Sequence, residues 1–179
     1  GLIRNFGEAA SAVQEPVEAR DRIRAELGIS GDSPLLLALG RLHEVKAHDV
    51  LLQALPQLKG AELMLAGEGP LENDLRALAE RHRISDRVHF LGWRRDIGDL
   101  FAACDISVFP SRYEPNGTVV MESWAHGKPL VASRAKGPEW LVDDGENGLL
   151  FPIDDVASCA TAIRRLIKDS EMVERLVEK

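Results

Sequence analysis

Cysteine is scarce in this sequence, and its two cysteines lie far apart. Cys104 and Cys159 are the only cysteines among 179 residues, and neither belongs to a Cys-x-x-Cys pair. Such spacing is untypical of a disulfide framework or a zinc site, and both residues have apolar neighbours, as buried thiols usually do. We therefore expect reduced cysteines and a cytoplasmic location for this chain.

Long apolar runs and a surplus of positive charge are also missing. No apolar run is long enough for a membrane-spanning helix, and the start of the chain shows no signal-peptide pattern. The net charge of -7 and the isoelectric point of about 5.3 argue against a surface for nucleic acid. We expect no nucleic-acid partner, and contact with a membrane only as a peripheral association at its inner face through another domain.

The patterns that usually bind metals are absent as well. The five histidines include His43 and His48, whose spacing of five does not align them on one face of a helix. The acidic stretch 143–148, DDGENG, lacks the spacing of a calcium loop and is typical of a turn before a strand. No Asp-x-Asp motif precedes a short loop. We expect neither a metal nor a cofactor.

Continuously apolar runs alternate with amphipathic segments along the chain. This order predicts an α/β fold with a doubly wound, mostly parallel sheet of about six strands and helices on both faces, a Rossmann-like domain. Residues 17–179 form this single domain in our interpretation, and residues 1–16 are the remains of an interdomain linker. Strands are expected at 34–40, 61–67, 87–92, 105–110, 129–133 and 148–151, and helices at 47–59, 70–82, 95–104, 118–126, 155–169 and in the tail to 179.

Proline and glycine set several of these helix boundaries. Pro56 must lie near the end of its helix or kink it, and Pro70 is well placed at a first helical position. Gly127 is expected to close the helix that starts near Thr118.

Two cations lie in the loop that follows the first expected strand, in the sequence GRLHEVK from Gly40 to Lys46. Gly40 allows a tight turn at the sheet edge. Arg41 and Lys46 then offer a fork of donors and a mobile point charge, which together suit a diphosphate. The alternative is a solvated pair on a surface loop that contributes only to helix capping.

The stretch EPNGTVVME places Glu114 and Glu122 on either side of an expected helix start. The backbone amides of Gly117, Thr118 and Val119 head that helix without intrahelical partners, which makes an anion site. Because carboxylates only accept hydrogen bonds, acids beside a phosphate suit the hydroxyls of a nucleotide sugar. The alternative is that the acids stabilise the helix start through its dipole, which would explain Glu114 better than Glu122.

Several motifs resemble those of one family in order and interval over about residues 1 to 170. They are GRLHEVKAHDVLLQAL, AGEGPLENDL, RVHFLGW, PSRYEPNGTVVMESWAHGKPLVAS and DGENGLLFP. They look like the C-terminal, donor-binding domain of retaining GT-B glycosyltransferases of group 1, family four. The departures are Asn116, Ala47 and the triplet ESW, where this family usually has an apolar residue, glycine and a triplet of the EAM type.

The resemblance implies a role for each residue that matches the family's motifs. Arg41, Lys46 and Glu114 would be catalytic, the two cations by holding the diphosphate and Glu114 by contacting the donor sugar. Glu122 would accept hydrogen bonds from the ribose hydroxyls. The rest of the nucleotide-sugar site would comprise Gly40, Trp93, Arg94, Asn116, Gly117, Thr118 and Val119, with Trp93 and Arg94 beside the base. Among the three tryptophans, the sequence favours a ligand role only for Trp93, because it lies in a loop.

The resemblance also implies a partner, because a GT-B enzyme has a second Rossmann-like domain that supplies the acceptor site. We therefore expect this chain to be the donor-binding half of a sugar transferase, inactive alone, in the assembly of bacterial lipopolysaccharide or another surface glycan. The alternatives are a sugar-nucleotide epimerase of related architecture, a glycoside hydrolase using Glu114 and Glu122, and a non-catalytic nucleotide-binding module. GEGP at 67–70 lacks the third glycine of a dinucleotide fingerprint, which disfavours a dehydrogenase.

Overall fold

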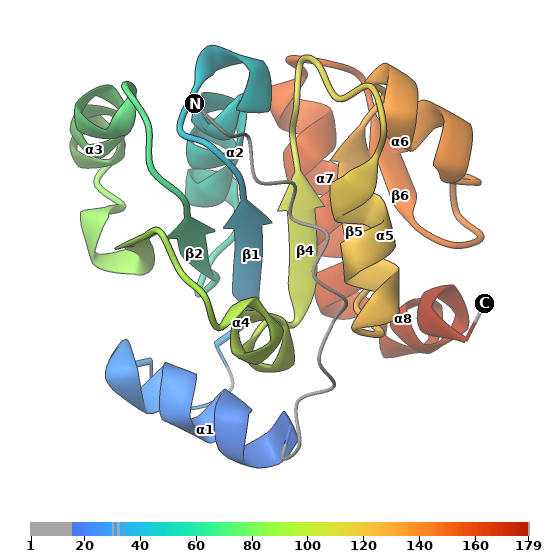
Figure 1. The fold of residues 1–179 in the computed structure, drawn as a ribbon, viewed down its shortest axis with the longest axis horizontal. Coiled ribbons are helices and arrows are strands. Elements are labelled where there is room, and N and C mark those ends of the chain that lie inside the picture. The colour runs from blue at the N-terminus through green and yellow to red at the C-terminus, as the bar shows by residue number, and fades with distance from the viewer. Residues whose placement is uncertain (1–15, 30, 32, 179) are drawn as a thin grey trace.

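A parallel sheet with helices on both faces forms the body of the molecule (Figure 1). The computed structural model describes residues 16–29, 31 and 33–178. The strand order is β3-β2-β1-β4-β5-β6, and every neighbouring pair is parallel, which confirms the predicted fold class. The strands are β1 (Leu35–Leu39), β2 (Glu62–Ala66), β3 (Val88–Gly92), β4 (Ile106–Phe109), β5 (Leu130–Ser133) and β6 (Leu149–Phe151).

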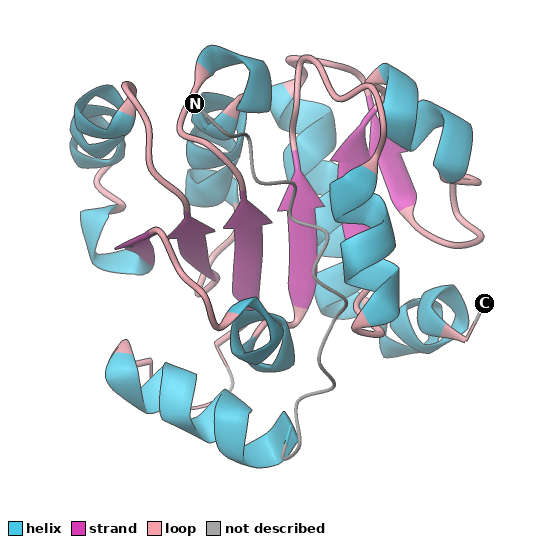
Figure 2. Cartoon of the chain, in the orientation of Figure 1, coloured by secondary structure: helices cyan, strands magenta, loops and turns pink. Residues whose placement is uncertain are grey.

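Eight α-helices lie in the described part of the chain, and Figure 2 separates them from the strands by colour. The first four are α1 (Pro16–Glu26), α2 (His48–Ala54), α3 (Glu72–Arg81) and α4 (Ile97–Ala103). The others are α5 (Thr118–Ala125), α6 (Lys136–Leu141), α7 (Val156–Lys168) and α8 (Ser170–Val177). Three short 3-10 helices, η1 (Glu44–Lys46), η2 (Leu55–Gln57) and η3 (Ser85–Arg87), complete the connections.

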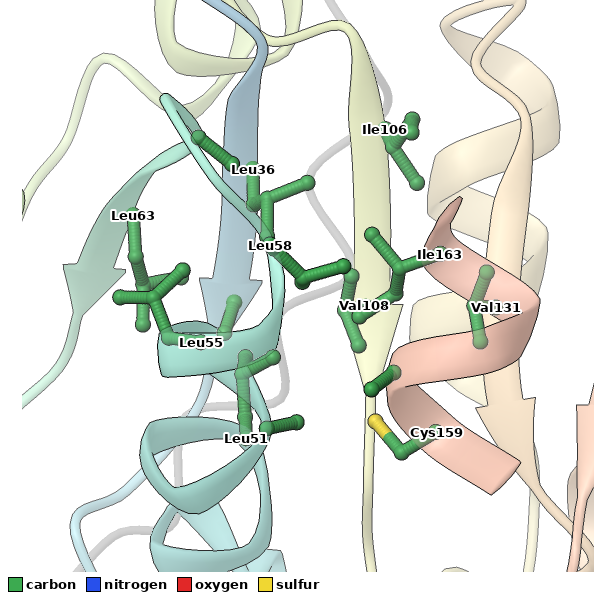
Figure 3. Close-up of a cluster of buried hydrophobic side chains, with 14 of the residues drawn as sticks. Leu36, Leu51, Leu55, Leu58, Leu63, Ile106, Val108, Val131, Cys159 and Ile163 are labelled. Atoms are coloured by element: carbon green, nitrogen blue, oxygen red, sulfur yellow. The ribbon is translucent and has the colours of Figure 1, made fainter. Parts of the chain in front are cut away.

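Alternation along the buried strands divides the core into two clusters, one on each face of the sheet. On β1, Leu36 and Ala38 belong to the cluster covered by α2, α3, α7 and α8. Leu35, Leu37 and Leu39 belong to the other cluster, which α1, α4 and α5 cover. Figure 3 shows the first cluster, where Leu51, Leu55 and Leu58 face the strands alongside Cys159 and Ile163 of α7.

Several local predictions are confirmed by the backbone. Pro56 lies in η2 directly after α2, so the helix over 47–59 stops at Ala54 where proline would remove a hydrogen bond. Gly127 has a φ of 61° just beyond α5, the conformation that ends many helices. Cys104 and Cys159 are free and buried, and burial raises the pKa of each thiol to about 12. The cytoplasmic location stays a prediction.

Three expectations about the helices are wrong or incomplete. Pro70 does not occupy a first helical position, because it lies in a turn and α3 begins at Glu72. Helix α1 was not predicted, and it begins at Pro16, the last residue assigned to the linker. Helix α6 was not predicted either, because its Gly137–Pro138 pair resembles a loop. The remainder of the predicted linker, residues 1–15, lies outside the described residues.

The strand order reverses between β1 and β4, and this reversal determines where a ligand can bind. The chain leaves β1 toward α2 on one face, whereas it leaves β4 toward α5 on the other. Ligands of open α/β sheets bind at such a switch point, beyond the carboxyl ends of the strands. In Figure 1 these ends of β1 and β4 point upward, side by side. In the described chain, no helix is both long and apolar enough to cross a membrane.

Candidate functional site

The loop after β1 carries the two predicted cations and is shaped by glycines. The backbone N–H of Gly40 donates to the Ala66 carbonyl at 3.0 Å, and the chain then turns toward η1. Gly40 has a φ of 140°, and a Cβ there would lie 3.4 Å from the stem of Lys46. The Lys46 side chain therefore lies over Gly40, and a larger residue at position 40 would strain the backbone there.

The neighbouring GEGP loop uses its glycines for packing rather than for a phosphate. A Cβ on Gly67, whose φ is 144°, would lie 2.0 Å from the carbonyl oxygen of Gly40. A Cβ on Gly69 would lie 2.3 Å from the carbonyl oxygen of Leu42. Both glycines therefore allow the loop after β2 to support the backbone that carries Arg41. Close approach explains this motif without a dinucleotide.

The loop after β4 brings Glu114 against Lys46. Lys46 Nζ lies 2.6 Å from Glu114 Oε2, and the side chains are 21% and 9% exposed. The two loops are also joined through their backbones, since the N–H groups of Arg112 and Tyr113 both donate to the Val45 carbonyl, at 2.9 and 3.2 Å. An acid and a cation that are 68 positions apart in the sequence thus form one ion pair at the switch point.

Helix α6 supports the Glu114 loop from the other side. The N–H of Gly137 donates to the Glu114 carbonyl at 2.7 Å. A Cβ on Gly137 would lie 2.4 Å from the backbone nitrogen of Gly117 and 2.6 Å from the Glu114 carbonyl oxygen. Only glycine therefore fits at this contact, and the missed helix α6 contributes directly to the shape of the site.

The start of α5 has the free amides that the sequence predicts. Gly117 precedes the helix with a φ of 62°, and its carbonyl accepts from Val120 at 3.0 Å. Within the described residues, the N–H groups of Gly117, Thr118 and Val119 donate no hydrogen bond. Asn116 and Thr118 are exposed beside these amides. The geometry is that of a helix N-terminus with unpaired amides, which suits an anion, although Gly117 itself is buried beside Gly137.

Glu122 lies one turn further along α5 and differs from Glu114 in its surroundings. It is half-buried, and its carboxylate has no hydrogen bond or ion pair with a described residue. Burial, together with the charge of Glu114, raises the pKa of the Glu122 carboxyl, while Lys46 opposes the shift. The three groups are thus close enough for their charges to interact, and Glu122 is left available to an external donor.

Arg41 contrasts with Lys46. It is exposed, and within the described chain its guanidinium has neither an ion-pair nor a hydrogen-bond partner. Exposure on a surface loop, which the alternative assumes for both cations, therefore describes Arg41 but not Lys46, which is largely buried and paired. The role of Arg41 in binding a diphosphate stays a prediction.

The loop after β3 supplies Trp93 but engages Arg94 elsewhere. Trp93 is 53% exposed, with the Arg95 guanidinium 5.2 Å from its ring centre. Arg94 donates to Asp96 at 2.7 and 2.8 Å and to Glu26 of α1 at 2.6 Å, and these hydrogen bonds raise its pKa further. The Arg94 guanidinium is therefore already paired with carboxylates of its own loop and of α1, and its place beside the base stays a prediction. Trp93 remains the exposed aromatic side chain of this loop.

His48, the first residue of α2, lies buried beneath the loop that carries Arg41. It is 3% exposed, and neither ring nitrogen has a hydrogen-bond partner of good geometry among the described residues. Burial and the nearby charge of Lys46 lower the pKa of the ring to about 4, although the backbone of Gly40 and Arg41 slightly favours the charged form. His48 is therefore neutral near pH 7 and adds no charge to the site.

Sequence reasoning missed three residues that shape this site: His48, Arg112 and Gly137. A signal for Arg112 was its positive charge two positions before Glu114. A signal for Gly137 was its place in a Gly-Pro pair.

Metal binding has no candidate site in the described part of the chain, where no group of three or more His, Cys, Asp or Glu side chains could hold an ion. The absence of a metal or cofactor in function stays a prediction.

Comparison with known proteins places this geometry in a context. The family model described as glycosyl transferases group 1 matches residues 19–179. The lipopolysaccharide core biosynthesis glycosyltransferase LpsE of Rhizobium meliloti (strain 1021) is 40% identical over 156 residues, 87% of this chain and 46% of the relative. LpsD of the same organism, with the same description, is 35% identical over 175 residues, 98% of this chain and 49% of the relative.

A solved structure also resembles the chain. The crystal structure of Anabaena Alr3699/HepE in complex with UDP-glucose has a TM-score of 0.84 and 30% identity, and covers 89% of this chain and 46% of that one. The chain thus spans about half the length of each of these relatives.

The buried His48 should make stability depend on pH. Its pKa is about 4 when folded and 6.5 as a free side chain, so the unfolded chain binds the proton first as the pH falls. The contribution of His48 to the free energy of unfolding is therefore fully present above pH 6.5. It decreases by up to about 3 kcal/mol as the pH falls to about 4. Urea unfolding of wild type and His48→Leu at pH 7 and pH 4.5 measures the difference.

The His48→Leu variant should lose less free energy of unfolding between the two pH values than the wild type does. Replacement of the exposed His82 by alanine is the control and should leave the pH dependence as it is in the wild type. Equal losses for wild type and His48→Leu would show that His48 is not the neutral buried group described above.

Proposed function

Because the chain belongs to the family of group 1 glycosyl transferases, we propose that it binds the donor of a sugar-transfer reaction, a nucleoside diphosphate sugar. The observation that carries this proposal is the meeting of Lys46, Glu114 and the free amides of α5 at the switch point between β1 and β4. UDP and UDP-glucose are the first ligands to test, because the similar Anabaena protein was crystallised with UDP-glucose.

The diphosphate is the best-supported part of this ligand. Arg41 has no partner among the described residues and offers a planar fork of donors, while Lys46 contributes a charge that its carboxylate partner already holds in position. The amides of Gly117, Thr118 and Val119 supply neutral donors at the positive end of the α5 dipole. Gly40 keeps the approach open beside the Lys46 stem.

The hydroxyl groups of the donor account for the two glutamates. Glu122 has no other partner in the described chain and would accept hydrogen bonds from the ribose. Glu114 would face the transferred sugar while it remains paired with Lys46. Asn116 and Trp93 are both exposed. Asn116, which precedes the start of α5, would lie on the sugar side of the proposed ligand, and Trp93, in the loop after β3, on the base side.

The same groups suit the chemistry of transfer with retention. As the bond between the anomeric carbon and the phosphate oxygen breaks, both electrons of that bond go to the diphosphate. Arg41, Lys46 and the α5 amides would stabilise this growing negative charge, and such stabilisation is stronger in the transition state than in the bound donor. The acceptor hydroxyl forms the new bond on the same face of the sugar, and its proton passes to the departing diphosphate oxygen.

A glycoside hydrolase that uses Glu114 and Glu122 as its two acids fits the site less well. Such an enzyme needs one carboxyl group that gives up a proton, and it has no need for a diphosphate site. Glu114 instead pairs with the largely buried ammonium group of Lys46, whose loop also carries the exposed Arg41.

Transfer itself requires more than donor binding. Because the relatives are about twice as long as this chain, we propose that it acts with an acceptor-binding domain and does not transfer sugar alone. LpsE and LpsD are named for lipopolysaccharide core biosynthesis, which supports a proposed role in bacterial surface-glycan assembly at the cytoplasmic side of a membrane.

Removing either cation should weaken nucleotide binding, with different effects on folding. Arg41→Ala should cost about 1.5 kcal/mol in UDP affinity, because the charged hydrogen bond is lost from an exposed position. Its unfolding free energy should not change. Lys46→Ala should weaken UDP further and destabilise the fold by on the order of 3 kcal/mol, because it leaves Glu114 buried without its partner.

Calorimetry with UDP and urea unfolding measure both quantities. Lys59→Ala is the control, since Lys59 is an exposed lysine that follows η2 at the opposite edge of the sheet. Unchanged UDP affinity in both site variants would refute the phosphate assignment.

Substitution of each glutamate should weaken the binding of different ligands. Glu122→Gln removes the charged acceptor for the ribose and should weaken UDP and UDP-glucose alike, by on the order of 1–3 kcal/mol. Glu114→Gln should weaken only UDP-glucose. Bare UDP should bind this variant as well as wild type or better, because Lys46 no longer shares its charge with a carboxylate. The ratio of the two affinities in each variant, from calorimetric titration, decides the assignment.

If Glu114→Gln weakened UDP and UDP-glucose equally, Glu114 would not be the sugar contact. Its role would then be limited to holding Lys46 and stabilising the start of α5.

A further inference from the structure

Arg112 lies two residues before Glu114 and makes more polar contacts than the residues of the site itself. Its Nη1 donates to the Glu44 carbonyl at 2.9 Å. Nη1 and Nη2 donate to the two carboxylate oxygens of Asp49 at 3.0 and 2.8 Å, in the two-pronged arrangement typical of arginine. Nε donates to Asp154 at 2.6 Å.

These partners belong to three separate segments of the chain. Glu44 begins η1, the short helix that ends at Lys46, and Asp49 lies in the first turn of α2. Asp154 lies in the turn between β6 and α7 and has a φ of 62°, a conformation that costs free energy in a residue other than glycine. One guanidinium therefore connects the loop after β4 to the segments before and after Lys46 and to a strained turn.

The main chain of Arg112 strengthens the same connection. The Arg112 N–H donates to the Val45 carbonyl at 2.9 Å, while the Arg112 side chain donates to the carbonyl of Glu44, the residue before Val45. The two carbonyls just before Lys46 are thus both held by the residue two positions before Glu114. The ion pair between Lys46 and Glu114 joins the ends of this small framework.

The contacts favour a geometric role over a contribution from charge alone. The side chains of Arg112 and Asp49 are 28% and 35% exposed, so water screens much of their attraction. The planar guanidinium of Arg112, which has hydrogen bonds to three residues, nevertheless fixes the orientation of those residues relative to the loop after β4. A single flexible ammonium group cannot do this.

We propose that Arg112 is a positioning residue, which holds the Lys46 loop against the Glu114 loop and so sets the spacing between the lysine and the amides of α5. Arg112 need not touch the ligand for this role. The inference rests on the proposed function only for its effect on nucleotide binding; the hold on the loop exists without a ligand.

Arg87 provides a matched control. It also makes several hydrogen bonds through one guanidinium, with Nη1 donating to Leu58 at 2.9 Å and to Ala61 at 3.1 Å. It lies in η3, next to the amino ends of the strands, whereas the site lies beyond their carboxyl ends. Arg87→Ala should lower the melting temperature of the protein without changing the structure of the site or its UDP affinity.

The test compares Arg112→Ala, Arg112→Lys and Arg87→Ala with the wild type. Hydrogen exchange of the ligand-free proteins should be faster than wild type over residues 40–49 in both Arg112 variants, and unchanged there in Arg87→Ala. UDP affinity should fall about tenfold in Arg112→Ala, because a displaced Lys46 weakens one charged hydrogen bond to the phosphate. Arg112→Lys keeps the charge but not the fork, so it should not restore the affinity.

Four outcomes are informative. Wild-type exchange over residues 40–49 in a folded Arg112→Ala protein would overturn the inference, as would full UDP affinity in Arg112→Lys, which would show that charge alone matters. If Arg112→Ala does not fold, Arg112→Lys and Asp49→Asn provide the same comparison. If the wild type binds no UDP, the proposed function fails, while the exchange data still decide whether Arg112 holds the loop.

Discussion

The ion pair between Lys46 and Glu114 is the interaction on which the candidate site depends. It joins two loops that are distant in the sequence, and both side chains are largely withdrawn from water. A pair in such a place gains little net stability, but the loss of either partner leaves a buried charge alone. Its value lies in position, because it presents a lysine beside the free amides of α5.

The sheet makes this pair possible. The two loops meet because β1 and β4 are neighbours, and because the chain leaves them toward opposite faces. Glycines then let the backbones approach, with Gly67 against the carbonyl of Gly40 and Gly137 against that of Glu114. Two apolar clusters hold the strands, so polar groups gather where the strands end. The fold thus places the charges, and the charges determine what can bind.

The sequence predicted the strands and the long helices because their patterns are local. The run LLLAL of β1 and the amphipathic α7 need no knowledge of the rest of the chain. Helix α1 was missed because only Ala19, Ile23 and Arg24 of its eleven residues are buried, and α6 because Gly-Pro resembles a loop. At the site, Arg41 and Lys46 could be found from a motif. The pairing of Lys46 with Glu114 and of Arg94 with Glu26 could not, since both pairs join residues 68 positions apart.

The most direct test is a titration of the isotope-labelled chain with UDP, followed by amide NMR. The account predicts saturable shifts for the amides of Gly40 to Lys46 and of Gly117 to Val119. Amides at the opposite edge of the sheet, such as those of Ser85 to Arg87, should not shift. Saturable shifts confined to that opposite edge, or no saturable shift at all, would contradict the claim that the loops after β1 and β4 form a nucleotide site.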